Sequence, residues 1–195
     1  LYGGFDGSEV LLSQRDPVAH VTVLSGEPSP SLSTETWHVV TGASRILLSG
    51  VTITGALYTD VFFDPQGGGL YLVGASNVRL EDCIVYDNIL DDLGDTFGDH
   101  AQGGGIFCDS SSLVLWNCAF SGNRVGQMGG AAIHAIDSPL RIVNCTFDQN
   151  RDRPSGFSWG CIWQEGAQSI SVIGSTFTWN TGPVRQREGG LFVAE

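Results

Sequence analysis

The strongest constraint on the fold is an eleven-residue segment that recurs along most of the chain. Four copies align without gaps, and a weaker copy precedes them. Successive copies start 32, 35, 27 and 30 residues apart. Repeats of this period indicate a solenoid, in which each repeat is one coil that buries its apolar side chains against its neighbours. The five copies are residues 46–56, 78–88, 113–123, 140–150 and 170–180.

Within each copy, apolar and polar residues alternate, and the alternation restarts after a corner. A third short apolar stretch precedes several copies, as at residues 70–73 and 106–107. Alternation with a period of two is typical of β-strands. Three strands per coil, with like residues aligned from coil to coil, predict an all-β fold: a right-handed parallel β-helix of roughly five to seven coils. We expect residues 1–195 to form one β-helix domain, or a segment that further coils continue.

Polar and sulfur-containing residues recur at fixed positions and are predicted to stack as structural columns. The asparagines that end each copy can hydrogen-bond through their side-chain amides to the next coil. The cysteines after the corner are expected to form a buried column of free thiols. A disulfide within that column is the alternative, because adjacent coils bring Cα atoms within bonding range. The predicted columns contain Asn88, Asn123, Asn150 and Asn180; Asp82, Asn117 and Asn144; and Cys83, Cys118 and Cys145.

Segments of variable length follow the asparagine positions and are predicted to form loops on one face, where solenoids often bind ligands. The longest contains Asp91, Asp92, Asp95 and Asp99. Oxygen ligands at such short spacing suit Ca²⁺. The spacing matches no established calcium motif, so a solvated acidic loop is the alternative. The predicted insertions are residues 57–66, 89–102, 124–128, 151–159 and 181–188.

Two surface features predict contacts with a partner. An apolar stripe on the outward side of three consecutive coils either packs under a loop or forms an interface. The insertions near the N-terminus are acidic and the later ones basic, which favours head-to-tail contact between copies through their open ends. The residues of these predicted interfaces are Trp116, Val143 and Ile173 in the stripe, and Arg151, Arg153, Arg185 and Arg187 in the late insertions.

Charge excludes some classes of protein. The chain carries 21 acidic and 9 basic residues, a net charge of −12, so binding to nucleic acid is not expected. No apolar run is long enough to predict a membrane-spanning helix. The sequence contains no phosphate-binding loop, dinucleotide fingerprint or nucleophile elbow. We therefore assign no catalytic residue.

Three of the repeats carry a resemblance to a known family. The segments 120–123, 147–150 and 177–180 resemble the F-x-x-N repeat of the polymorphic outer membrane protein family, and residues 103–106 resemble its companion G-G-A-I motif. The resemblance covers roughly residues 37–192. It implies secretion, a location outside the cell or on a bacterial cell surface, and an adhesive role.

The sequence thus predicts a non-enzymatic extracellular structural or adhesive β-helix protein that assembles head-to-tail. One alternative is a carbohydrate-active β-helix enzyme, either a polysaccharide lyase or a hydrolase. The other is a glycan-binding module that uses exposed aromatic residues such as Trp159 or Trp179. The expected partners are another copy of the chain, flanking coils of a longer protein, or surface glycans.

Overall fold

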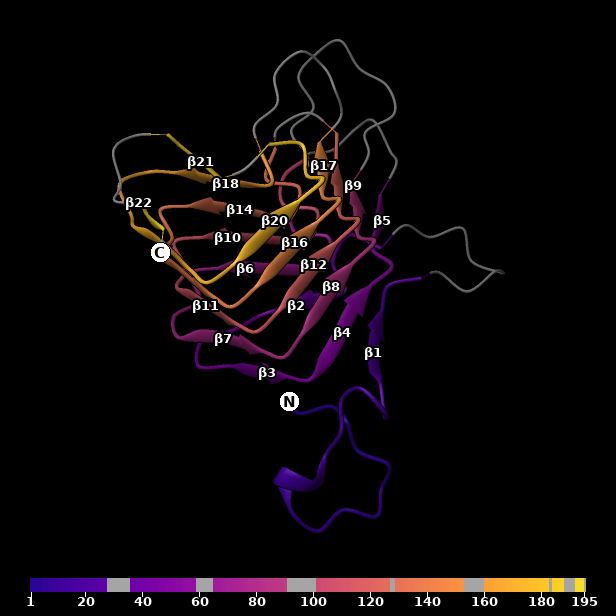
Figure 1. Ribbon diagram of the computed structural model, residues 1–195. Coiled ribbons are helices and arrows are strands. Elements are labelled where there is room, and N and C mark those ends of the chain that lie inside the picture. The colour runs from indigo at the N-terminus through magenta and orange to yellow at the C-terminus, as the bar shows by residue number, and fades with distance from the viewer. Residues whose placement is uncertain are drawn as a thin grey trace.

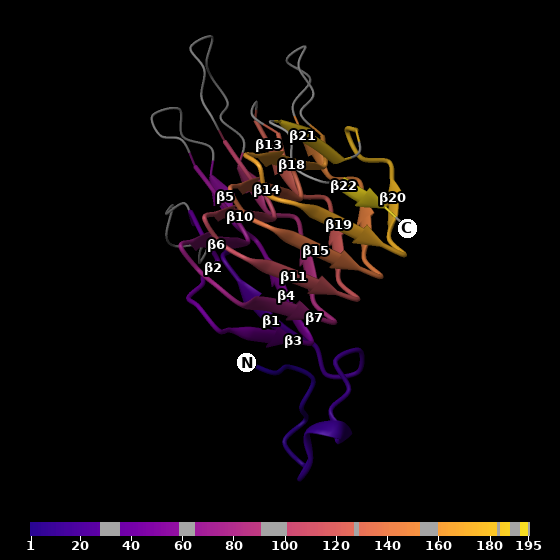
Figure 2. The same ribbon diagram turned by 90° about the vertical axis from the view of Figure 1, so that its left-hand side faces the viewer.

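The computed structural model confirms an all-β parallel solenoid (Figures 1 and 2). The one helical element in the described part of the chain is a 3-10 turn, Leu12–Gln14. No helix among the described residues is long and apolar enough to cross a membrane. The structure describes residues 1–27, 36–58, 65–90, 101–126, 129–152, 160–182, 184–187 and 192–194.

The strands form four parallel sheets, numbered here in the order in which one coil visits them, starting from β2. Sheet 1 contains β2 (Val40–Thr41), β6 (Leu70–Val73), β10 (Ile106–Asp109), β14 (Ile133–Ile136), β18 (Ile162–Glu165) and β21 (Val184–Arg187). Sheet 2 contains β3 (Leu47–Ser49), β7 (Val78–Glu81), β11 (Leu113–Trp116), β15 (Leu140–Val143), β19 (Ile170–Ile173) and β22 (Phe192–Ala194). Sheet 3 contains β1 (Thr22–Ser25), β4 (Val51–Thr54), β8 (Ile84–Tyr86), β12 (Ala119–Ser121), β16 (Thr146–Asp148) and β20 (Thr176–Thr178). Sheet 4 contains β5 (Leu57–Tyr58), β9 (Ile89–Leu90), β13 (Arg124–Val125) and β17 (Arg151–Asp152).

The number of turns and the number of strands per turn both differ from the expectation. The described strands make about four turns that contribute to all four sheets, fewer than five to seven. Sheets 1, 2 and 3 each contain six described strands, whereas sheet 4 contains four, so only four turns contribute a strand to every sheet. Each of these turns also has a fourth strand. Its two residues are too few for an alternating pattern, so sequence reasoning assigned them to the insertions.

Equivalent side chains stack in register from coil to coil, and the interior is built from these columns. The clearest column contains three phenylalanine rings of sheet 3. The ring centroids of Phe120 and Phe147 lie 4.9 Å apart, and those of Phe147 and Phe177 lie 4.6 Å apart, with interplanar angles of 9° and 4°. Phe147 is fully buried. Burial and ring contact together make this column a large contribution to stability.

The corner between sheets 2 and 3 requires a left-handed backbone conformation in every coil. The φ angles at Gly50, Asp82, Asn117, Asn144 and Gly174 lie between 52° and 66°. Glycine, asparagine and aspartate adopt this conformation at the lowest cost. The residue types in this column are therefore explained by backbone geometry.

The N-terminal residues join the β-helix at two places and leave it between them. Tyr2 forms a parallel bridge with Ser49 of sheet 2, and β1 pairs with β4 in sheet 3. Residues 4–21 extend away from the coils between these two contacts (indigo in Figure 1). This excursion is called the N-terminal segment below.

Candidate functional site

The four asparagines that end the repeats form a continuous hydrogen-bonded ladder. Asn123 Nδ2 donates to Asn150 Oδ1 at 2.8 Å and to the carbonyl oxygen of Val85 at 2.9 Å. Asn123 Oδ1 accepts hydrogen bonds from the side chain and the backbone N–H of Asn88. Asn180 continues the pattern above Asn150. The ladder satisfies buried polar groups of the coil corners, which makes its role structural.

The cysteines at the start of sheet 3 lie in one buried column of free thiols. The Sγ atoms of Cys83, Cys118 and Cys145 each lie 3.2–3.5 Å from backbone carbonyl oxygens. Ser175 takes the same place in the next coil. Hydrogen bonding with Cys145 and Cys83, together with burial, raises the pKa of the Cys118 thiol. A thiol with a raised pKa is a poor nucleophile, so packing accounts for Cys118.

The predicted apolar stripe lies in register on the outer side of sheet 2. Trp116 pairs with Val143, and Val143 pairs with Ile173. Trp116 is 42% exposed, whereas Val143 is only 6% exposed. The stripe therefore offers a solvent-exposed aromatic ring at one end and a covered residue at its centre.

The predicted arginines do not lie in one place. Arg151 begins β17 in sheet 4, while Arg185 and Arg187 lie in β21 of sheet 1. The expected insertion at 181–188 is therefore wrong in part, because residues 184–187 pair with β18. Arg153 lies outside the described residues.

Variation in coil length is concentrated at one corner. The step from the first residue of the sheet 2 strand to that of the sheet 3 strand is six positions in four consecutive coils. The connection from sheet 4 to the next strand of sheet 1 varies instead. It takes eight positions from Val125 to Ile133 and sixteen from Leu90 to Ile106. All insertions therefore leave from this one edge, called the insertion corner below.

The predicted calcium ligands belong to the longest connection at this corner. Asp91, Asp92, Asp95 and Asp99 all lie outside the described residues. In the part of the chain that is described, no group of three or more His, Cys, Asp or Glu side chains is placed to hold a metal ion. The calcium site stays a prediction from sequence.

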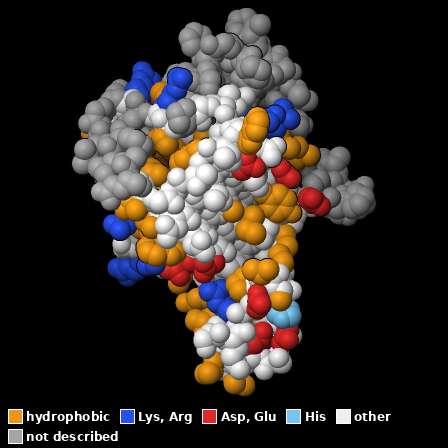
Figure 3. All heavy atoms as spheres, viewed as in Figure 1, with side chains coloured by type: hydrophobic (Ala, Val, Ile, Leu, Met, Phe, Trp, Pro, Cys, Tyr) orange, Lys and Arg blue, Asp and Glu red, His pale blue; other side chains and the backbone are white. Residues whose placement is uncertain are grey.

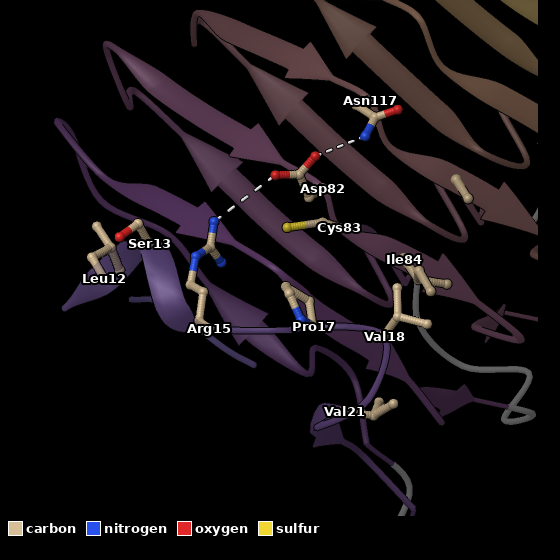
Figure 4. A pocket seen from close by; sticks show the side chains of 11 residues that line it. Leu12, Ser13, Arg15, Pro17, Val18, Val21, Asp82, Cys83, Ile84 and Asn117 are labelled. Atoms are coloured by element: carbon tan, nitrogen blue, oxygen red, sulfur yellow. Dashed lines mark hydrogen bonds and ion pairs between the residues drawn. The ribbon is translucent and has the colours of Figure 1, made fainter. Parts of the chain in front are cut away.

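A pocket of about 610 Å³ lies between the N-terminal segment and the start of the sheet 3 strands (Figure 4). One wall comes from the N-terminal segment, and the other from β8, β12 and the corners before them. The lining is mainly aliphatic, with a few polar groups at one side, as is common in ligand pockets. The lining residues are Leu12, Ser13, Arg15, Pro17, Val18, Val21, Asp82, Cys83, Ile84, Asn117 and Ala119.

The polar side of this pocket is fixed by Arg15. Its guanidinium donates to Ser49 Oγ at 2.7 Å and to the carbonyl oxygens of Ser49 and Gly3. It also lies 3.9 Å from Asp82 Oδ2, and Asp82 Oδ1 accepts a hydrogen bond from Asn117 Nδ2 at 2.7 Å (Figure 4). The Asp82 side chain is 44% exposed. The Arg15 guanidinium is therefore held by protein groups, whereas the exposed Asp82 carboxylate can still accept a hydrogen bond from a molecule in the pocket.

Sequence reasoning missed Glu165, the acidic partner of a buried histidine on sheet 1. His134 is fully buried, pairs in register with Phe107 and Trp163, and lies 3.6 Å from Glu165 Oε1. Trp163 Nε1 donates to the same oxygen at 2.9 Å. The contact with His134, and then the bond from Trp163, lower the pKa of Glu165 to about 2. An alignment of the sheet 1 strands as a separate repeat would have shown that Phe107, His134 and Trp163 occupy equivalent positions.

Comparisons with known proteins identify the fold. No curated protein and no solved structure shows significant similarity to the chain. The family model described as "Right handed beta helix region" matches residues 33–177, which is most of the chain. The match agrees with the stacked coils, the parallel sheets and the interior columns described above. The chain therefore belongs to the right-handed β-helix family.

Proposed function

We propose that this protein is a non-enzymatic, extracellular β-helix of a bacterial cell surface that binds its partner through the insertion corner. The observation that carries the proposal is the contrast in coil length. The coil body keeps a nearly constant length while the connection at one corner varies twofold, from eight to sixteen positions. Constant length preserves the stacking, and free variation in length is typical of the loops with which solenoids bind.

The location and the adhesive role rest on the repeat motifs. The F-x-x-N segments place phenylalanine in the stacked column and asparagine in the ladder, so the motif has a clear structural purpose here. Its likeness to the polymorphic outer membrane protein repeat supports a surface location. Calcium bound by Asp91, Asp92, Asp95 and Asp99 would order the longest insertion, because carboxylate oxygens are the ligands that this cation prefers.

The proposal is tested by shortening the longest insertion without changing the coil body. Residues 91–100 are replaced by Gln127-Met128, two residues of the shortest connection, which makes the two connections equal in length. We expect thermal unfolding to change little, while adhesion of coated beads to cells or to a glycan array is lost. The matched control is Thr146→Ser, an exposed position on sheet 3. Unchanged adhesion in the shortened variant would exclude the insertion corner as the binding surface.

Calcium binding by the longest insertion is tested separately. Isothermal titration of the wild-type chain with CaCl₂ should show binding that disappears in the shortened variant and in Asp91→Asn/Asp95→Asn. The replacement of Asp109 in β10 by Asn serves as the control, since it removes one carboxylate outside the insertion. Absence of a heat signal in the wild-type chain would remove calcium from the proposal but leave the binding corner in place.

Glycan binding is a second candidate, favoured by exposed aromatic rings. Trp37, Trp116 and Trp179 are 44%, 42% and 81% exposed, and such rings pack against the apolar faces of sugars. A glycan array separates binding from catalysis when the bound polysaccharide is afterwards assayed for new reducing ends or unsaturated uronates. Release of either product would favour the carbohydrate-active enzyme over the non-enzymatic adhesive protein.

A further inference from the structure

Two of the stacked cysteines at the start of sheet 3 are close enough to be joined. The backbone N–H of Ala119 donates to the carbonyl oxygen of Cys83 at 2.9 Å, so Cys83 and Cys118 lie in register on adjacent coils. Neighbouring strands lie about 4.8 Å apart, within the range of about 4.4–6.8 Å that disulfides span between Cα atoms. The two thiols are also in hydrogen-bond contact. A disulfide between them therefore requires no large movement of the backbone.

Access from solvent differs among the three thiols of the column. Cys83 lines the pocket beside the N-terminal segment, whereas Cys118 and Cys145 are not among the residues that line it (Figure 4). The pocket walls are aliphatic, and Val18 and Ile84 in them are 89% and 44% exposed. Figure 3 shows hydrophobic side chains at the surface of this end of the molecule. A small neutral reagent that enters the pocket therefore meets Cys83 before the other two thiols.

The hydrogen bonds within the column also favour Cys83 as the thiol that attacks. Hydrogen bonding with Cys118 lowers the pKa of the Cys83 thiol, and the opposing effect of burial is smaller. The thiolate is the form of cysteine that attacks a disulfide. The pKa of Cys118 is raised by hydrogen bonding with Cys145 and Cys83, by burial and by the charge of Cys83. A neutral mixed disulfide at Cys83 removes two of these causes, so Cys118 can then act as the second nucleophile.

The N-terminal segment covers the corner that leads to Cys83. Arg15 and Pro17 lie against Gly50, where a Cβ would be 2.6 Å from Arg15 Nη1 and 2.7 Å from Pro17 Cγ. Cys83 is only 1% exposed, so a reagent reaches its sulfur when this cover moves. The cover is held by the polar contacts of Arg15, and a region held by few bonds opens more readily than a packed core. The N-terminal segment therefore controls access to the thiol.

We propose that Cys83 and Cys118 are a redox-active pair, in which a small neutral disulfide enters the pocket beside the N-terminal segment, reacts at Cys83 and leaves a Cys83–Cys118 disulfide that joins two adjacent coils. The column of free thiols is then the reduced state of this pair. The chemistry is independent of the insertion corner and of the proposed adhesive role.

The reaction proceeds in two exchanges. The Cys83 thiolate attacks one sulfur of the small disulfide, forms a mixed disulfide and releases the first small thiolate, which takes the proton of the Cys118 thiol. The Cys118 thiolate then attacks the Cys83 sulfur, and the second small thiolate leaves and takes up the proton that Cys83 gave up when it ionised. Two electrons pass from the protein thiols to the small disulfide, which is reduced to two small thiols.

Oxidation of the reduced, folded chain by hydroxyethyl disulfide tests the pair. After alkylation of the remaining thiols, digestion with trypsin and with a protease that cuts before aspartate separates the cysteines, and mass spectrometry identifies the linked peptides. We expect the chain to lose two of its five thiols and to show Cys83 linked to Cys118. The midpoint of thermal unfolding should rise by about 4–15 °C in the oxidised chain and return after reduction.

Serine variants separate the roles of the three cysteines, and Ser175 shows that serine fits the same column in the next coil. Cys83→Ser should prevent oxidation, because the reagent loses its point of attack. Cys118→Ser should trap the small thiol on Cys83 as a stable mixed disulfide. Cys145→Ser is the matched control and should still form the Cys83–Cys118 disulfide.

The role of the N-terminal segment is tested by Arg15→Ala, which removes the contacts that hold it. The rate of reaction at Cys83 should rise about 5–30-fold, because the open form of the segment becomes more populated. Arg79→Ala, which breaks a surface ion pair with Glu81, is the control and should leave the rate unchanged.

Several results would overturn the proposal. Retention of all five thiols by the folded wild-type chain, under conditions that oxidise the same chain in urea, would exclude a reactive pair. Oxidation of Cys83→Ser, or a disulfide between Cys118 and Cys145 in place of the expected one, would exclude Cys83 as the point of attack. An unchanged rate in Arg15→Ala would exclude the pocket as the route of entry. Circular dichroism confirms that each variant is folded before it is scored.

Discussion

The coil body and the N-terminal segment are held together in different ways. In the coil body, columns such as Phe120, Phe147 and Phe177 repeat the same contact from turn to turn. In the N-terminal segment, aliphatic residues such as Val10 and Val18 are 85% and 89% exposed, and the chain is held by polar contacts. Stability in the coil body is therefore shared between neighbouring turns, whereas the N-terminal segment depends on a few local bonds.

This difference bears on function. A region whose apolar side chains are already buried has little left to offer a partner. The N-terminal segment keeps its aliphatic side chains at the surface and arranges them around a pocket. Variants in the two regions should therefore differ in their effects, and the largest expected effect is on stability.

The largest effect is expected from Phe147→Ala in the coil body. The ring is fully buried between Phe120 and Phe177, so its removal leaves a cavity inside the column. We expect the free energy of unfolding to fall by about 3–5 kcal/mol. Urea denaturation measures it, and Phe177→Ala at the less buried end should cost clearly less. Equal losses of unfolding free energy at both positions would contradict the conclusion that each ring is stabilised by its neighbours in the column.

Substitutions in the asparagine ladder should also lower the free energy of unfolding more at the centre than at the end, but by a smaller amount. Asn123→Ala leaves partners on Asn88, Asn150 and Val85 without a hydrogen bond in a buried corner. We expect a loss of about 2–4 kcal/mol, since each unsatisfied buried group costs about 1–3 kcal/mol. Asn180→Ala, at a half-buried position, should cost less than half as much. Thermal and urea unfolding check the ratio of the two losses.

Removal of Arg15 should release the N-terminal segment and leave the coil body folded. Arg15→Ala deletes the bonds to Ser49 and Gly3, and we expect a loss of about 1–2 kcal/mol. Limited proteolysis should cut the variant within residues 4–21 much faster than the wild-type chain. Arg79→Ala, which breaks a surface ion pair with Glu81, is the control and should change neither measurement. Cooperative loss of the whole fold would show that the two regions are not separate.

The smallest effects concern pH. Hydrogen bonds from the backbone N–H groups of Ala19 and Val18 hold the pKa of Asp16 below its ordinary value of 3.8, and the pKa of Glu165 is lowered to about 2. A carboxylate with a lowered pKa stabilises the fold above its unfolded pKa, and that contribution is lost as the pH falls through the folded value.

The protection of backbone amides against hydrogen exchange, corrected for the intrinsic exchange rate at each pH, should therefore decrease in both regions as the pH falls from 5 to 2. Asp16→Asn should remove the pH dependence around residues 16–20 alone, and Glu165→Gln should remove it around β18 alone. An effect of either variant on the other region would mean that the two carboxylates report one common transition.

The sequence by itself determined the solenoid and its interior. Parallel stacking in register forces equivalent residues of each coil to meet, so the alignment of the repeats alone placed the asparagines and cysteines in columns. The alternation of apolar and polar residues assigned the strands for the same reason. The two-residue strands of sheet 4 escaped this reasoning because alternation needs more residues to be visible, and β21 was taken for an insertion.

The tertiary structure alone decided where surfaces meet. The pocket joins Arg15 to Asp82, and no repeat relates these residues because the N-terminal segment lies outside the coils. The contact of His134 with Glu165 depends on which coils are neighbours and on the rotamers of both side chains. A repeating sequence specifies contacts between equivalent positions, and contacts between unlike positions require the folded chain.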